Sequence, residues 1–304
     1  MEGGLTGTVR GAVAGMIAAF LILLAGCSDA PGGAGAERPP PNPLLYEIAS
    51  ADGTVEGWML GTIHALPDGT EWRTREIGRV IDEADLLVVE IAALADQSAT
   101  ARTFAALSKT RGLLPLAERL PADLKPQLAA LLVDGDISPQ RFADTETWAA
   151  AIMLAQIGAT GDPANGVDRA LISDFAQRPV RELEGAAAQL AIFDRLPEAQ
   201  QRYMLAAVVR ESDQARKDPV RLQRAWLAGD AAAIEQSARE GFLADPALRE
   251  ALLTGRNRRW AEVLVPLLQQ PARPLIAVGT AHLVGDEGLA SLLQAQGYRV
   301  RRLP

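Results

Sequence analysis

The chain has only two histidines, and both end the same four-residue pattern, Gly-Thr-x-His. One pattern runs from Gly61 to His64 and the other from Gly279 to His282. Each follows an apolar run that predicts a buried β-strand. Because glycine allows the backbone to turn sharply after a strand, each histidine is expected to project from a strand end.

Two such turns on neighbouring strands would bring the imidazoles together, since ligands of open α/β sheets bind at the carboxyl ends of strands. Thr62 and Thr280 stand at matching positions, where a hydroxyl caps the next element or donates a hydrogen bond. Imidazoles combined with carboxylates commonly bind divalent metal ions, so we interpret the pair as one shared site. The alternative is that each histidine caps its own strand end.

Two glutamates supply the carboxylates of this interpretation. Glu90 ends the apolar run 86–89, where a charge is costly unless it is paired or bound to a metal ion. Glu184 ends a short predicted strand and precedes a predicted helix. The alternative for each is a strand-end side chain that faces solvent.

Three other polar residues are weaker candidates. Asp168 follows Gly166 by two residues, a position where aspartate more often caps a helix start. Arg256 and Asn257 lie on a predicted long helix, with Trp260 one turn later. An arginine there is usually solvated or in a structural ion pair, but in a hydrolytic site it would stabilise a developing oxyanion.

The elements that must position these residues predict an α/β fold. Strands are predicted near both chain ends, at 44–49, 55–60, 86–89, 179–183, 275–278 and 298–300, with Asp52-Gly53 as a hairpin turn. Helices are predicted over 73–84, over 285–296, and in broken stretches over 94–176 and 186–270. This order predicts one mixed sheet built from both chain ends, with a large helical insertion between them.

The overall composition is that of a globular protein, with 48% hydrophobic and 22% charged residues. The formal net charge is −8, and no run of basic residues stands out. Nucleic-acid binding needs a positive surface that displaces counterions from phosphates, so we exclude that class of function.

Cys27 is the only cysteine, and it ends an apolar stretch that begins at Gly11, just after Arg10. The sequence Leu-Ala-Gly-Cys over 24–27 matches a lipobox, so we predict a lipid on Cys27 that anchors the protein to a membrane, facing the periplasm. Residues 1–26 are then a signal peptide, the Gly- and Pro-rich residues 27–43 a tether, and 44–304 the folded domain. The alternatives are a plain signal peptide or an N-terminal membrane anchor.

Together these motifs resemble the TraB/GumN family, which includes the Tiki proteins, and most of all its GumN-type bacterial lipoproteins. The resemblance covers the chain from Leu44 to the C-terminus. It rests on both Gly-x-x-His motifs, the glutamate after the second apolar run, a Gly-x-Asp segment, Leu-Glu before a Gln-containing helix, and Arg-Asn ahead of tryptophan. The matching positions are Gly61, His64, Glu90, Gly166, Asp168, Leu183, Glu184, Gln189, Arg256, Asn257, Trp260, Gly279 and His282.

The resemblance implies an EreA/ChaN-like fold of two related halves and, as in Tiki-like members, a metal-dependent peptidase. We therefore expect a hydrolase in which His64, His282, Glu90 and Glu184 hold Mn²⁺, Co²⁺ or Zn²⁺, which would activate water. Glu90 would be a ligand or the general base, and Arg256 or a strand-end N–H would hold the oxyanion. The alternatives are a lipoprotein that binds haem or iron through histidine, and a structural role in envelope polysaccharide assembly.

Overall fold

The computed structural model describes residues 40–94 and 97–304, and its centre is a six-stranded sheet of order β4-β3-β5-β2-β1-β6. The strands are β1 (Leu45–Ala49), β2 (Val55–Thr62), β3 (Leu86–Val89), β4 (Val180–Glu182), β5 (Pro274–Gly279) and β6 (Arg299–Arg302). The predicted α/β fold, with one mixed sheet built from both chain ends, is confirmed.

The sheet combines two kinds of pairing. Strand β1 is antiparallel to both β2 and β6, and the expected hairpin joins β1 to β2. Strands β2, β5, β3 and β4 are parallel neighbours, with Thr62 opposite Gly279 in the β2–β5 register. The carboxyl ends of these four strands therefore meet at one edge of the sheet, where side chains from distant parts of the chain can converge.

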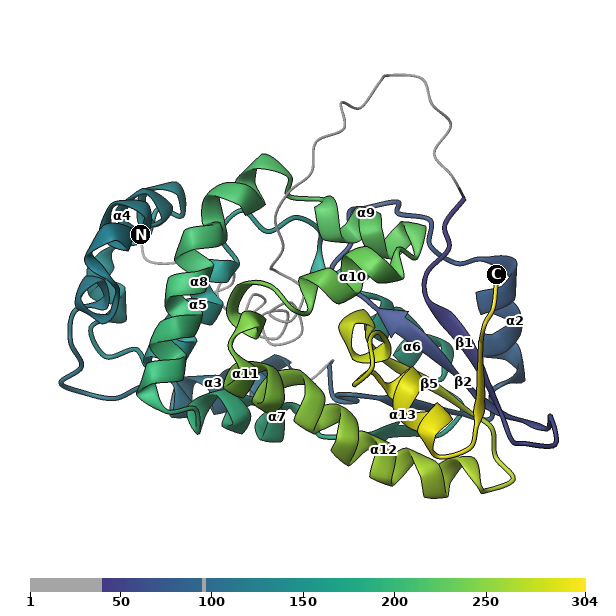
Figure 1. The fold of residues 1–304 in the computed structure, drawn as a ribbon. Helices are drawn as coiled ribbons and strands as arrows, with labels where there is room; N and C mark the ends of the chain where they lie inside the picture. The colour runs from purple at the N-terminus through teal and green to yellow at the C-terminus, as the bar shows by residue number, and fades with distance from the viewer. Residues whose placement is uncertain (1–39, 95–96) are drawn as a thin grey trace.

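Helices cover both faces of the sheet (Figure 1). Side chains of β3 and β5 alternate between two apolar clusters, because successive residues of a strand point to opposite faces. Leu87 and Leu275 pack with α2 (Arg75–Glu83) and α6 (Val167–Asp174). Val88 and Ile276 pack with α12 (Gly255–Leu268) and α13 (Leu289–Ala295). The sheet is thus the middle layer of three and is fixed from both sides.

The helical insertion forms a separate apolar cluster, seen on the left of Figure 1 around α4, α5 and α8. Trp148 lies at its centre, against Phe104 and Phe193. The insertion and the segment that follows it comprise α3 (Gln97–Leu107), α4 (Lys125–Asp134), α5 (Thr147–Ala155), α7 (Ala186–Asp194), α8 (Glu198–Lys217), α9 (Arg221–Ala228), α10 (Ala231–Ser237) and α11 (Pro246–Arg249).

One helix boundary differs from the sequence predictions. The helix predicted over 285–296 begins only at Leu289, because Gly285 has a φ of 77° and Gly288 caps the helix. The stretch 94–176 is broken as predicted, into α3, α4, α5 and α6 with 3₁₀ turns between them.

A π-helical turn, Glu250–Thr254, leads directly into α12, and such turns are frequent at functional sites.

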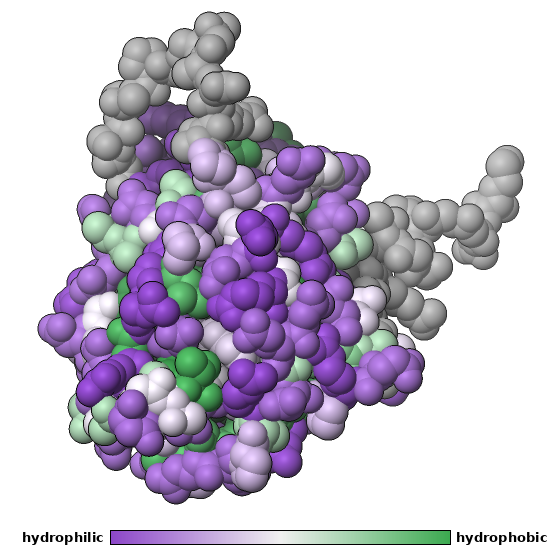
Figure 2. Space-filling view, turned by 90° about the vertical axis from the view of Figure 1, so that its right-hand side faces the viewer, coloured by the Kyte–Doolittle hydropathy of each residue, from purple (hydrophilic) through white to green (hydrophobic). Residues whose placement is uncertain are grey.

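The predicted signal peptide, the predicted lipid site at Cys27 and most of the predicted tether lie outside the described residues. Within 40–94 and 97–304, no helix combines the length and apolar character needed to cross a membrane. The face of the domain in Figure 2 is mainly hydrophilic, and its apolar side chains appear in small separate groups.

Candidate active site

The predicted site residues meet at the carboxyl edge of the parallel strands. His64 follows β2, Glu90 follows β3, Glu184 follows β4, and His282 lies in a 3₁₀ turn (Thr280–Leu283) directly after β5. All four side chains are at most 10% exposed. Polar groups so deeply buried must satisfy one another, so their hydrogen bonds define what each can do.

The first histidine is held by a carboxylate. Nδ1 of His64 donates to Oδ2 of Asp168 at 2.6 Å, and the Thr62 hydroxyl donates to the other carboxylate oxygen at 2.8 Å. Asp168 can reach the ring because Gly166 lets α6 approach: a Cβ on Gly166 would lie 2.5 Å from the His64 carbonyl oxygen. Asp168 therefore orients His64 with Nε2 directed into the site.

The carboxylate of Glu90 is fixed through both oxygens. Its Oε1 accepts from the backbone N–H of Gly279 at 2.8 Å. Its Oε2 accepts from Arg256 at 2.6 Å and from the side-chain amide of Gln189 at 3.1 Å. Oε1 keeps a free lone pair and lies on the same side as Nε2 of His64, since both approach the position that a Cβ on Gly279 would take, at 3.2 and 3.8 Å.

Arg256 is 1% exposed and lies at the centre of the cluster. Its Nε and Nη2 donate to Glu184 at 2.8–3.1 Å, and Nη2 also donates to Glu90. Its Nη1 donates to the Leu252 carbonyl in the π-helical turn and to Nε2 of His282, both at 3.1 Å. All five N–H groups of the guanidinium are thus committed, so none is left for the oxyanion that the sequence analysis assigned to it.

The second histidine is fully buried and bonded at both nitrogens. Its Nδ1 lies 2.5 Å from Oδ1 of Asn257, and its Nε2 accepts from Arg256. The ring also packs against Trp260, with centroids 4.4 Å apart. His282 therefore has no ring nitrogen free for a ligand.

Gly61 and Gly279 lie where a side chain would collide with, or crowd, other residues of the site. A Cβ on Gly61 would lie 2.4 Å from the hydroxyl of Thr280, so only glycine fits where the second motif packs against the first. A Cβ on Gly279 would lie 3.2 Å from Oε1 of Glu90 and 3.8 Å from Nε2 of His64, so it would occupy the position beside both atoms. Each glycine thus keeps open a space that the site requires.

These contacts shift the pKa values of the two histidines in opposite directions. Burial lowers the pKa of His64, but the charge of Asp168 and its hydrogen bond outweigh burial and raise this pKa above 6.5. For His282, burial and the charge of Arg256 lower the pKa to about 3. Burial alone would raise the pKa of Glu90, but Arg256 and the histidines bring it to about 2. At neutral pH, Glu90 is ionised and His282 is neutral.

The donor set does not fit the four-ligand metal site expected from sequence. Among the side chains of residues 40–94 and 97–304, no three histidine, cysteine, aspartate or glutamate groups are arranged to hold a metal ion. The physical reason is Arg256, whose guanidinium takes the Nε2 lone pair of His282 and both oxygens of Glu184. Of the four expected ligands, His64 keeps its Nε2 unbonded, and this nitrogen and Oε1 of Glu90 lie near one position beside Gly279.

The structure thus brings together every residue that the sequence singled out in the domain. Gln189 matched the family motif in the sequence but was not predicted as a site residue, and the structure adds it to the site: it lies on α7, is 3% exposed, and its Oε1 has no hydrogen-bond partner among the described residues. Its signal in the sequence is weak, because a single glutamine in a helix that follows a strand is common.

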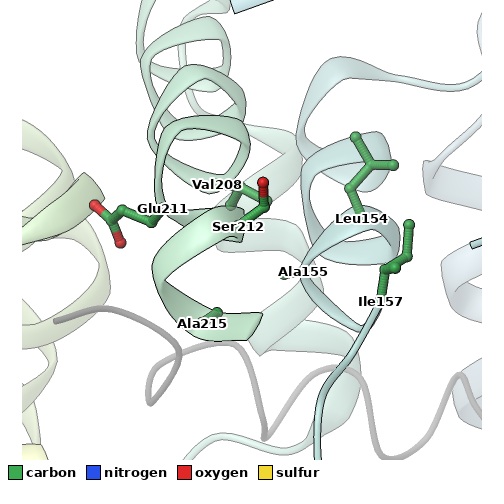
Figure 3. A pocket seen from close by; sticks show the side chains of 7 residues that line it. All are labelled: Leu154, Ala155, Ile157, Val208, Glu211, Ser212 and Ala215. Carbon is green, nitrogen blue, oxygen red and sulfur yellow. The ribbon is translucent and has the colours of Figure 1, made fainter. Parts of the chain in front are cut away.

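A hollow lies between α5 and α8, and neither histidine lines it (Figure 3). Its lining is mostly apolar and consists of Leu154, Ala155, Ile157, Val208, Glu211, Ser212 and Ala215. Burial raises the pKa of Glu211 to about 7. In Figure 3, this carboxylate points away from Leu154 and Ile157, so the hollow does not gather polar groups as the histidine site does.

Comparison with known proteins places the chain among bacterial relatives. It is 26% identical to "Uncharacterized protein YbaP" of Shigella flexneri over 247 residues, 80% of this chain and 89% of the relative. It is 27% identical to the protein of the same name from Escherichia coli K12 over 241 residues, 78% of this chain and 87% of the relative. No solved structure shows significant similarity to it. The family match covers residues 44–302, which include both Gly-Thr-x-His motifs, and the chain belongs to the TraB/PrgY/gumN family.

Proposed function

We propose that this protein is a hydrolase, with peptides as the first substrate class to test, and that His64 is its general base. The observation that carries the proposal is the Asp168–His64 pair, whose open Nε2 faces the same space as an oxygen of Glu90. An imidazole held by a buried carboxylate accepts a proton well, because the carboxylate stabilises the imidazolium that forms.

The arrangement suits the activation of one water molecule. A water in the space beside Gly279 would donate one hydrogen to Nε2 of His64 and the other to Oε1 of Glu90, which leaves an oxygen lone pair for attack. As the water oxygen attacks a carbonyl carbon, its proton moves to Nε2. His64 then passes this proton to the leaving nitrogen as the C–N bond breaks. Glu90 stays ionised throughout because Arg256 neutralises it.

Arg256 is a positioning residue in this scheme. It holds Glu90 and Glu184 together, and its own charge is already matched by two carboxylates. Counting Asp168, the cluster has three carboxylates and one guanidinium, so a proton on His64 during the reaction lowers the surplus negative charge. This surplus favours the proton transfer that the mechanism needs.

The test is hydrolysis of a peptide library by the wild type and by the His64→Gln and Asp168→Asn variants. Loss of a general base lowers turnover by roughly 10²- to 10⁴-fold. Asp230→Asn is the matched control, because Asp230 caps α10 outside the site and asparagine caps equally well. Equal turnover in all four proteins would refute the proposal.

The predicted metal stays a prediction, and the same assay tests it. Chelated protein is compared with protein supplied with Mn²⁺, Co²⁺ or Zn²⁺, and turnover that requires the ion would restore the metal-dependent mechanism. The haem alternative has its own outcome, a Soret band on haem addition that the His64→Gln variant loses.

The membrane anchor is also proposed on sequence alone. The support is the position of Cys27 at the end of the apolar stretch. If the anchor is correct, the protein labels with a lipid precursor and fractionates with membranes, and Cys27→Ser abolishes both. Retention of the label by the variant would contradict it.

A further inference from the structure

For each hydrogen bond around His282, the donor and the acceptor can be deduced from the partner groups. The backbone carbonyl of Glu287 can only accept, and it lies 2.8 Å from the side-chain nitrogen of Asn257. This contact fixes the orientation of the amide, because its NH₂ group must face the carbonyl. The Asn257 oxygen therefore faces Nδ1 of His282, at 2.5 Å.

The tautomer of His282 follows from this orientation. The Asn257 oxygen only accepts, so Nδ1 must carry the proton. At the other side of the ring, the Arg256 guanidinium only donates, so Nε2 must be the unprotonated nitrogen. Both ends of the chain of hydrogen bonds specify the same neutral form, Nδ1–H.

This tautomer has a consequence for the water-activating pair. Nε2 of His282 and the Leu252 carbonyl together take both hydrogens of Nη1 and so fix the plane of the Arg256 guanidinium. In that plane, Nη2 reaches Oε2 of Glu90, which leaves Oε1 on the side of His64. The position of Glu90 thus depends on a histidine that has no free ring nitrogen.

The two motifs differ in one chemical respect. Asp168 gives His64 a charged acceptor at Nδ1, whereas Asn257 gives His282 a neutral one. A carboxylate beside His282 would favour a doubly protonated ring, whose second N–H would oppose that of Arg256. We propose that Asn257 is a positioning residue that fixes the Nδ1–H form of His282, and thereby the orientation of Arg256 and Glu90.

Nitrogen NMR tests the tautomer directly. The chain has two histidines, so nitrogen-15-labelled histidine gives four ring signals, and the His64→Gln variant leaves only the two of His282. Protonated and unprotonated ring nitrogens have widely separated shifts. We expect a protonated Nδ1 and an unprotonated Nε2 in the wild type. A protonated Nε2, or an average of both forms, would overturn the proposal.

Two substitutions test whether Asn257 sets the tautomer. Asn257→Leu removes the acceptor at similar volume and should give a mixture of forms, whereas Asn257→Asp keeps an acceptor and should keep Nδ1 protonated. A pure Nδ1–H form in Asn257→Leu would show that Arg256 alone sets it and would overturn the proposal. An unprotonated Nδ1 in Asn257→Asp would do the same, whether or not Nε2 gains a proton, and this variant decides if Asn257→Leu fails to fold. Asn42→Leu is the control, since Asn42 is exposed and its side chain contacts Arg302 rather than a residue of the site.

The expected effect on turnover rests on the proposed function. A displacement of about 1 Å in a reacting group can lower the rate by up to about 100-fold, so we expect a loss of roughly 10- to 100-fold in Asn257→Leu. The expected tautomers combined with absence of any hydrolysis would refute the hydrolase and leave the role of Asn257 intact. Hydrolysis with the wrong tautomer would refute only the role of Asn257.

Discussion

Replacement of Arg256 by methionine should destabilise the fold strongly. The change removes the buried cation that pairs with both Glu90 and Glu184, whose side chains are 7% and 10% exposed, and leaves only the exposed Arg259 at 4.0 Å from Glu184. Breaking a buried ion pair by removing one partner costs about 3–5 kcal/mol, because a charge is left buried without its partner. In a domain of this size, that loss corresponds to a fall in Tm of roughly 6–20 °C.

The destabilisation should also depend on pH in a defined direction. In the wild type, the pKa of Glu90 is about 2, below its ordinary 4.5, so this residue contributes stability above pH 4.5 that is lost as the pH falls toward 2. In the variant, burial is no longer opposed by Arg256 and favours the protonated carboxyl, which penalises folding at neutral pH. The gap between the two proteins should therefore narrow as the pH falls below 4.5.

The assay is thermal and urea unfolding of both proteins at pH 7 and pH 4. Arg258→Met is the matched control, because Arg258 lies on the same helix but pairs with Glu250 at the exposed surface. Exposed ion pairs contribute little, so the control should unfold close to the wild type. If Arg256→Met is no less stable than Arg258→Met, or if its deficit grows at low pH, the central role of Arg256 is refuted.

Three further predictions concern the two motifs. Gly279→Ala should lower kcat/KM by roughly tenfold or more with little loss of stability, because its methyl group enters the space beside His64. The kcat/KM of the wild type should rise with pH through a midpoint above 6.5 as His64 becomes the free base, and Asp168→Asn should move that midpoint down. Gly61→Ala should lower the free energy of unfolding by about 1–3 kcal/mol by overpacking, and the double variant Gly61→Ala with Thr280→Ala should recover part of this loss.

Each of these has a control or an outcome that contradicts it. Gly78→Ala is the control for both glycine variants, since a Cβ on Gly78 meets nothing within 4 Å. Wild-type kinetics in Gly279→Ala would show that the space beside Glu90 is not used. A midpoint unchanged in Asp168→Asn would exclude His64 as the titrating base. Strictly additive effects of Gly61→Ala and Thr280→Ala would show that the motifs do not interlock.

Local sequence patterns predicted much of the fold. The Asp52-Gly53 turn and the apolar runs before His64, Glu90 and His282 correctly located four strands, because strand burial and hairpin turns depend on neighbouring residues. The helix start predicted at Gly285 was wrong by four residues, because Gly285 adopts a positive φ and the helix begins only at Leu289.

The residues of the site could be predicted from the sequence, but their hydrogen-bond network could not. The doubled motif indicated that both imidazoles share one region, and they do. The sequence offered no sign that Arg256 uses all five donors internally, or that Gln189 contacts Glu90. Such contacts join side chains from distant parts of the chain, so local periodicity carries no information about them.

The pairing of the first strands with the last has a consequence for biosynthesis. Strand β2 can pair with β5, and β1 with β6, only after roughly two hundred further residues have been translated. Until β5 leaves the ribosome, the β1–β2 hairpin presents unpaired edges, and His64 has no neighbour from the second motif. A premature stop before Pro274 should therefore yield an aggregation-prone fragment rather than a partly active one.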